Sequence, residues 1–243
     1  MDYTFRFTPV LSRIDQLLDG LVVTLWISAV VIVLGFLVGL GGALASRSRS
    51  AALRRAVLCY VEAIRNTPFL AQLFFLYFGL PALGLKLDAV PAALIALVIN
   101  LGAYSTEIVR AGIDAVPRGQ YDAGMALGLS RAQIMRLIVL KPALRIVFPA
   151  LASQFTLLML ATSILSQIGV EELFHMAGIV DSVTYRSFEV YAVTCGFYLA
   201  SALAFRLLFA LIYRLAFAER LGVEKPDGGP KAPGVAPTTA VQH

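Results

Sequence analysis

Residues Tyr121–Arg145 read YDAGMALGLSRAQIMRLIVLKPALR, a polar stretch set between two long apolar segments. Its pattern predicts two short helices that meet at a sharp corner. Gly128 is placed to end the first helix, because glycine enters the left-handed region at no steric cost. Ser130 and Gln133 have the spacing of a capping box, which begins the second helix. That helix should end near Leu140 or bend before Pro142. A rigid corner of this kind indicates a docking site.

The composition around this stretch is that of a membrane protein. The chain has 243 residues, of which 59% are hydrophobic and only 14% are charged. Spanning a hydrocarbon core of about 30 Å takes roughly 20 apolar residues in a helix. We therefore predict an all-α integral membrane protein with five transmembrane helices, at about residues 21–45, 54–82, 89–112, 144–170 and 189–214.

The predicted organisation is a single transmembrane domain over residues 20–220. Residues 1–19 form a segment before it, residues 117–142 form the polar loop between helices three and four, and residues 221–243 form a disordered tail rich in Pro, Gly and Thr. Lys and Arg concentrate in residues 46–56, in the polar loop and after helix five. The positive-inside rule then places the N-terminus outside and the C-terminus in the cytoplasm. The net charge of +5 is accordingly a topology signal and does not indicate nucleic-acid binding.

Several classes of function are excluded by missing patterns. The sequence has no phosphate-binding G-x-x-x-x-G-K-[ST] motif, no His or Cys pair at metal spacing, and no catalytic triad. It also lacks two self-similar halves, which complete secondary transporters often have. The chain is therefore not expected to be an enzyme, to hydrolyse a nucleotide or to bind a cofactor or a metal.

The second predicted helix carries a polar break, Arg65-Asn66-Thr67-Pro68. Pro68 frees a backbone carbonyl, and Asn or Thr side chains can satisfy such groups inside a membrane. The break has either a structural role or a place in a translocation path.

Two further helices carry polar residues at helical spacing. Asn100, Tyr104 and Glu107 share one face of the third helix, and Ser163 and Gln167 share a face of the fourth. Polar side chains are costly in a membrane helix unless they face protein or water. They therefore either hold helices together or line a path for a polar substrate.

Several patches together are similar to the permeases of ATP-binding-cassette (ABC) importers, specifically those for polar amino acids of the histidine, glutamine, glutamate, arginine and opine group. The resemblance covers roughly residues 18–220. The patches are Asp19–Leu25, Arg65–Pro68, Gln72–Phe75, Tyr77–Pro81, Ala103-Tyr104 with Glu107 and Arg110, Gly112-Ile113, Val116-Pro117, Gly119-Gln120, Ala126–Ser130, Thr162-Ser163, and Phe188-Glu189 with Tyr191.

The polar loop resembles the EAA coupling motif of this family, with Asp122-Ala123-Gly124 as the triplet and Gly128 as the following glycine. Asp replaces Glu, Gly124 replaces Ala at a helix-propensity cost on the order of 1 kcal/mol, and Pro142 is shifted by one position. The resemblance implies that these residues, with Arg131, sit in a groove of a cytoplasmic ATPase.

The resemblance also implies the partners and the mechanism. A periplasmic amino-acid-binding protein delivers substrate to two permease subunits, identical or homologous, in the bacterial inner membrane. ATP is bound by the ATPase subunits, whose closure drives alternating access. Asn100, Tyr104, Glu107, Ser163 and Gln167 are the expected path residues. The alternatives are an ATP-independent channel or secondary carrier, and a membrane scaffold for a cytoplasmic partner.

Overall fold

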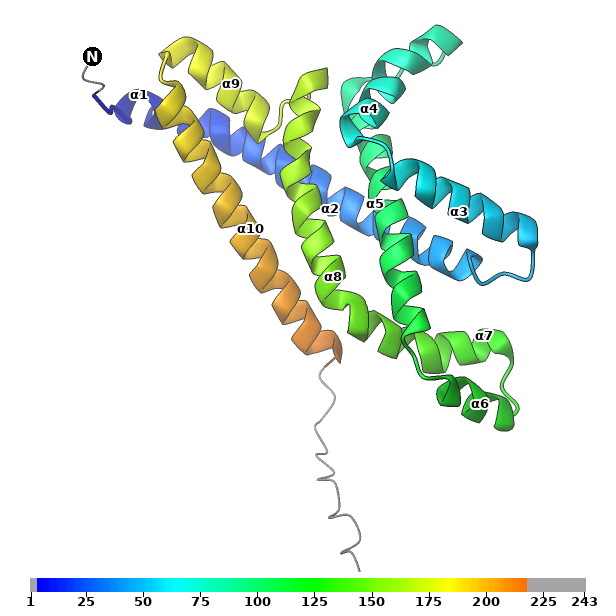
Figure 1. Cartoon of the computed structure of the whole chain (residues 1–243). Helices are drawn as coiled ribbons and strands as arrows, with labels where there is room; N and C mark the ends of the chain where they lie inside the picture. Colours follow the sequence, from blue (N-terminus) through cyan, green and yellow to red (C-terminus); the bar gives the residue numbers. More distant parts are fainter. Residues whose placement is uncertain (1–3, 218–243) are drawn as a thin grey trace, which may run out of the picture.

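The structure is a computed structural model that describes residues 4–217. Its four long helices are α2 (Ile14–Ala45), α5 (Ala89–Asp114), α8 (Leu140–Ala161) and α10 (Ser187–Phe217). Figure 1 shows α2 crossing α5 and α8 obliquely, while α10 runs away from the N-terminal end of α2. Four helical segments are long and apolar enough to span a membrane, namely Ile14–Ala45, Ala89–Asp114, Arg131–Ile168 and Ser187–Phe217.

Shorter elements connect the long helices. They are α1 (Thr8–Leu11), α3 (Ala51–Arg65), α4 (Phe69–Phe74), a π-helical turn (Phe75–Gly79), a 3-10 turn (Leu80–Leu83), α6 (Arg118–Ala126), α7 (Arg131–Gln133), a π-helical segment (Ile134–Val139), a 3-10 helix (Thr162–Ile168) and α9 (Leu173–Thr184). The last of these, α9, lies between the fourth and fifth predicted helices, in a stretch where no helix was predicted.

The expectation of five long spanning helices is wrong for the second of them. The predicted helix 54–82 is divided, because α3 ends at Arg65 and α4 begins at Phe69 beyond Pro68. The apolar part after the break, Phe69–Leu83, is shorter than a full span. The first long helix also begins at Ile14, inside the segment that was expected to precede it. The predicted tail 221–243 lies outside the described residues.

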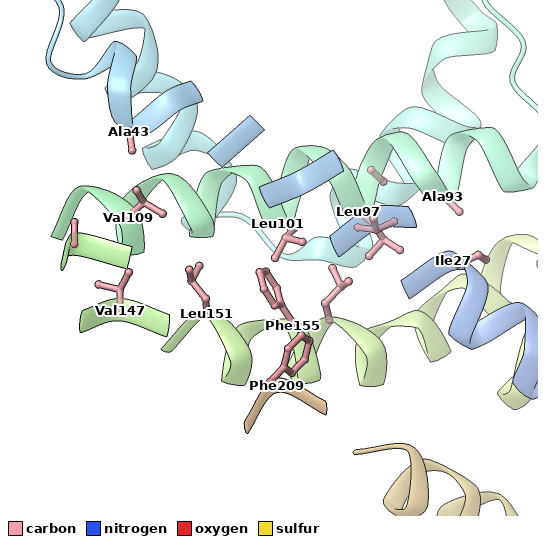
Figure 2. Packing of buried hydrophobic residues seen from close by; sticks show 14 of the residues in the cluster. Ile27, Ala43, Ala93, Leu97, Leu101, Val109, Val147, Leu151, Phe155 and Phe209 are labelled. Atoms are coloured by element: carbon pink, nitrogen blue, oxygen red, sulfur yellow. The ribbon is translucent and has the colours of Figure 1, made fainter. Parts of the chain in front are cut away.

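The core lies where α5 packs between α2 and α8, and Figure 2 shows Leu97, Leu101, Leu151 and Phe155 meeting there. Close approach of α2 to α5 depends on a glycine. A Cβ at Gly39 would lie 2.3 Å from the Ser105 Cβ, which is closer than real Cβ atoms come, and 3.0 Å from α5 backbone, which is a tight contact. Small residues serve the same purpose at many helix contacts in membranes, since lipid offers no hydrophobic driving force between helices.

The second loop helix does not end before Pro142. Helical structure continues from α7 through the π-helical segment Ile134–Val139 into α8, which contains Pro142. Figure 1 shows the axis changing direction between α7 and α8, so the proline is accommodated by a bend. The corner loop and the long helix α8 are therefore one continuous helical path.

Candidate functional site

The corner between α6 and α7 has the predicted construction. Gly128 adopts φ +73°, its N–H donates to the Met125 carbonyl (2.9 Å), and the Leu129 N–H donates to the Gly124 carbonyl (3.1 Å). These two bonds form a Schellman motif. The Ser130 N–H donates to Gln133 Oε1 (2.8 Å), while the Gln133 N–H donates to Ser130 Oγ (3.4 Å), so the capping box is confirmed.

The loop presents an exposed face with unusual apolar content. Asp122 and Ala123 are exposed, and so is Arg131 at the start of α7. Met125 and Leu127 are 58% and 77% exposed on the same short helix and its end. Large apolar side chains at such exposure on a polar loop mark an interaction surface. Met125 and Leu127 were not singled out from the sequence.

Gly124 does not belong to the exposed face. It is buried, and a Cβ there would lie 2.8 Å from Ile134 Cγ1 and 2.9 Å from Ile138 Cδ1. The glycine lets α6 pack tightly on the π-helical segment that follows α7. This contact gives a physical reason for glycine where the resembling family carries alanine.

The polar break after α3 is closed by side chains from both sides of it. The Ile64 carbonyl would accept from residue 68 in a continuous helix, but Pro68 has no N–H. Gln72 Nε2 donates to this carbonyl instead (2.8 Å), and also to Thr67 Oγ1 (2.8 Å). Asn100 Nδ2 donates to Gln72 Oε1 at 3.1 Å and ties the break to α5. No hydrogen bond of the Asn66 side chain is seen in residues 4–217.

A polar cleft of about 330 Å³ lies between α3 and α5, next to this break. The Arg65 guanidinium stands over the Tyr104 ring, 5.5 Å from its centroid, and 3.9 Å from the Glu107 carboxylate. The structure thus brings the polar break after α3 and the polar face of α5 into one site. From the sequence they were considered as two separate features. The lining residues are Leu58, Val61, Glu62, Arg65, Asn66, Tyr104, Glu107 and Arg110.

A chain of ion pairs leads from this cleft toward the corner loop. Glu107 accepts from Arg110 through both of its carboxylate oxygens, with Nε at 3.1 Å. Arg110 also lies 3.6 Å from the Asp114 carboxylate, and Asp114 pairs with Arg47 at the end of α2. Alternating charges at these half-exposed positions hold one another in place.

Ser163 and Gln167 do not join the cleft. They lie in the 3-10 helix Thr162–Ile168, where Ser163 Oγ donates to the Leu160 carbonyl (2.9 Å) and Gln167 Nε2 to Ser166 Oγ (3.3 Å). A 3-10 helix has three residues per turn, so positions four apart no longer share a face. The face expected from α-helical spacing is therefore absent at these two residues.

The cleft offers a cation, an anion and an aromatic face within one half-exposed space. That combination suits a small ligand with charges of both signs. Among residues 4–217, no three His, Cys, Asp or Glu side chains gather as a metal site would require.

Comparison with known proteins adds a family match over most of the chain. The model of the family described as "Binding-protein-dependent transport system inner membrane component" matches residues 32–217. The chain is 32% identical over 212 residues to the glutamine transport system permease protein GlnP of Escherichia coli (strain K12), covering 86% of this chain and 97% of that one. It is 39% identical over 171 residues to the L-cystine transport system permease protein TcyB of Bacillus subtilis (strain 168), covering 70% of each.

Two solved structures share the fold. A chain in the crystal structure of an amino acid ABC transporter with histidines matches with a TM-score of 0.81 and 36% identity, covering 88% of this chain and all of that one. A chain of the inward-facing MetNI methionine ABC transporter matches with a TM-score of 0.71 at 20% identity, over 84% of this chain and 98% of that one. The second match supports the fold alone.

Proposed function

Because the chain belongs to the family of binding-protein-dependent transport system inner membrane components, we propose that it carries a polar amino acid as one of two permease subunits of an ABC importer. The chain is the non-catalytic membrane subunit, and ATP is bound by the ATPase partner of the complex. The names of the relatives, which include glutamine and cystine permeases, support the substrate class.

The observation that carries this proposal is the opposed charge pair in the polar cleft. A free amino acid carries a carboxylate and an ammonium group a few ångströms apart. Arg65 offers a guanidinium to the carboxylate, and Glu107 offers a carboxylate to the ammonium group, beside the ring of Tyr104. Asn100 and Gln72 do not line the cleft; their hydrogen bond ties the adjacent helix break to α5. Because Arg65 and Glu107 already attract each other, substrate would exchange one set of ion pairs for another, which favours rapid release over tight binding.

The corner loop supplies the coupling. Asp122, Ala123, Met125, Leu127 and Arg131 form an exposed face that fits docking to an ATPase subunit. Helical structure runs without interruption from the loop into α8 and the following 3-10 helix, so force applied at the loop passes along the whole span. Gly128 and Gly124 contribute by shaping the loop. Closure of the ATPases would then switch the accessible side of the path.

This role requires the corner loop and the ends of α2 and α10 to face the cytoplasm, with the N-terminus outside. The clustering of arginines at those ends supports this orientation. The α8–α10 face carries a groove lined mainly by apolar and aromatic side chains, together with Arg206 and Arg214, which suits contact with the second permease subunit. A periplasmic amino-acid-binding protein would meet the opposite side, near α9.

Uptake by the reconstituted complex tests the proposal. Liposomes containing the permease and its ATPase, supplied with the binding protein, should accumulate a polar amino acid such as glutamine, histidine or cystine only with ATP, and should not accumulate leucine. Asn100→Leu should lower uptake about tenfold, equivalent to ~1.4 kcal/mol. Flux without ATPase would instead identify a channel or carrier, and an unaffected Asn100→Leu variant would favour a scaffold.

A further inference from the structure

A second, larger groove lies between the end of α2 and the corner loop. Its volume is about 860 Å³, and it is distinct from the polar cleft between α3 and α5. Its walls combine cationic and apolar side chains, namely Leu44, Arg47, Tyr121, Met125, Arg131, Ala132, Ile134, Met135, Arg136 and Leu140. Met125 and Arg131 also belong to the exposed face proposed to dock the ATPase, whereas none of the proposed substrate-path residues lines this groove.

The charge of the groove is only partly balanced. Arg47 is paired with Asp114, but no carboxylate in residues 4–217 lies within ion-pair distance of Arg131 or Arg136. The two guanidinium groups without a carboxylate partner give the groove a net positive charge, which is complementary to an oxyanion.

The position of the groove selects the kind of oxyanion. Leu44 is the penultimate residue of the spanning helix α2, and the arginine-bearing turn begins two residues later. The groove therefore lies where the hydrocarbon region gives way to the polar surface. Leu44, Met135 and Leu140 line its walls together with the arginines. Basic pockets between transmembrane helices on the cytoplasmic side commonly hold anionic lipid headgroups.

We propose that this groove binds one anionic phospholipid, with its phosphate at Arg136 and an acyl chain against Leu44 and Leu140. From the proposed function this takes only the orientation, that the end of α2 lies at the cytoplasmic surface. The bound lipid would touch both α2 and the helical path that leads from the corner loop into α8. The corner loop, which is proposed to couple to the ATPase, would thereby be in direct contact with a membrane lipid.

Lipid retention by the intact permease–ATPase complex tests the site. The complex, purified in neutral detergent, is offered equal amounts of phosphatidylglycerol and phosphatidylcholine with matched acyl chains, and bound lipid is counted by native mass spectrometry. The wild type should retain phosphatidylglycerol preferentially. Arg136→Gln should lower its retention about fivefold, as expected for ~1 kcal/mol per arginine near an anionic surface.

Arg55→Gln is the matched control, because Arg55 is exposed on α3 near the same end of α2 but does not line the groove. It should leave retention unchanged. Equal loss in Arg55→Gln and Arg136→Gln, or equal retention of the two lipids, would overturn the proposal. Displacement of the lipid by millimolar inorganic phosphate would identify a site for free anions instead.

A photo-crosslinking residue at position 44 identifies the occupant directly. The proposal expects phosphatidylglycerol adducts in the complex. Adducts with the ATPase or with the second permease would show that a protein surface fills the groove, and would reject the lipid. Neither measurement depends on amino-acid uptake, so failure here leaves the proposed transport function to its own test.

Discussion

The corner loop and the polar cleft are held together by different kinds of interaction. The loop takes its shape from backbone hydrogen bonds and caps between residues close in sequence, such as Leu129 to Gly124 and Ser130 to Gln133. The cleft takes its shape from side chains of three helices, through Gln72 with Asn100 and Arg65 with Glu107. Loop side chains are left exposed for a partner, while cleft side chains are engaged with one another.

Substitutions in the two regions should therefore differ in how far their effects spread through the molecule. A substitution in the loop changes a local conformation and should leave the membrane helices packed. A substitution in the cleft removes a partner from a polar group on another helix, and so its effect reaches beyond the residue changed. Matched pairs of substitutions, one in each region, distinguish the local effect from the long-range effect.

The largest contrast is expected between the two carboxylates Glu107 and Asp122. Glu107→Gln leaves Arg65 without its anion and Arg110 with Asp114 alone, so uptake should fall by a factor of roughly 30. Because these side chains are half-exposed, the free energy of unfolding should fall by about 1 kcal/mol. Asp122→Asn alters an exposed side chain and should leave stability within about 0.5 kcal/mol. Thermal unfolding in detergent and uptake in liposomes measure the two effects. Equal stability of the two variants would contradict the idea that the cleft depends on long-range pairs.

The next contrast lies inside the loop, at Gly128. Gly128→Val forces a β-branched residue into the left-handed region, at a cost of about 1–2 kcal/mol, whereas Gly128→Asn is compatible with that region. The open space around Gly128 means that the backbone alone decides the outcome. The valine variant should lose co-purification with the ATPase while its melting temperature in detergent changes little. Loss of the ATPase in both variants would point to the side chain rather than the turn.

A smaller difference is expected between two glutamines whose side chains bond to the backbone, one in each region. Gln72 satisfies the Ile64 carbonyl freed by Pro68 and also holds Asn100, whereas Gln133 completes a capping box on an exposed turn. Gln72→Leu should destabilise the chain by about 1–3 kcal/mol, and Gln133→Leu by about 0.5–1 kcal/mol. Urea midpoints of the two purified variants measure the difference. The reverse order would show that the loop, not the cleft, limits stability.

The same division explains what could be read from the sequence. The corner was predictable to the residue, because a left-handed glycine and a capping box are rules about neighbours. The family resemblance also followed from local patches. The position of Gly124 against Ile134 and Ile138 was not predictable, since it depends on how two helices fold back on each other.

Long-range geometry accounts for the remaining differences. Periodicity identified Asn100, Tyr104 and Glu107 as one face, but nothing in it placed Arg65 opposite that face. Ser163 and Gln167 were assigned by α-helical spacing, which the 3-10 helix does not keep. Gly39 was a recognisable signal, because Gly35 and Gly39 have the G-x-x-x-G spacing of close helix contacts.

The smallest expected effect is a pH dependence at Glu172, where the two kinds of interaction meet. This buried carboxylate caps α9 by accepting from the Phe174 and His175 N–H groups (2.9 and 2.8 Å), and it also accepts from the Tyr198 hydroxyl of α10 (2.9 Å). Burial raises the pKa of Glu172 above its ordinary value, although these hydrogen bonds oppose the shift. A raised pKa means that the folded protein binds the proton more tightly than the unfolded chain.

The stability from protonation of Glu172 is therefore fully present below the unfolded pKa, about 4.3, and is lost as pH rises through the folded value. Glu172→Gln keeps the shape but cannot titrate. The melting temperature of the wild type relative to Glu172→Gln should accordingly fall as pH rises from 5 toward 8. A difference that grows with pH would mean that the α9 cap and Tyr198 stabilise the charged form more than burial penalises it, so that local hydrogen bonds outweigh the cost of the buried site.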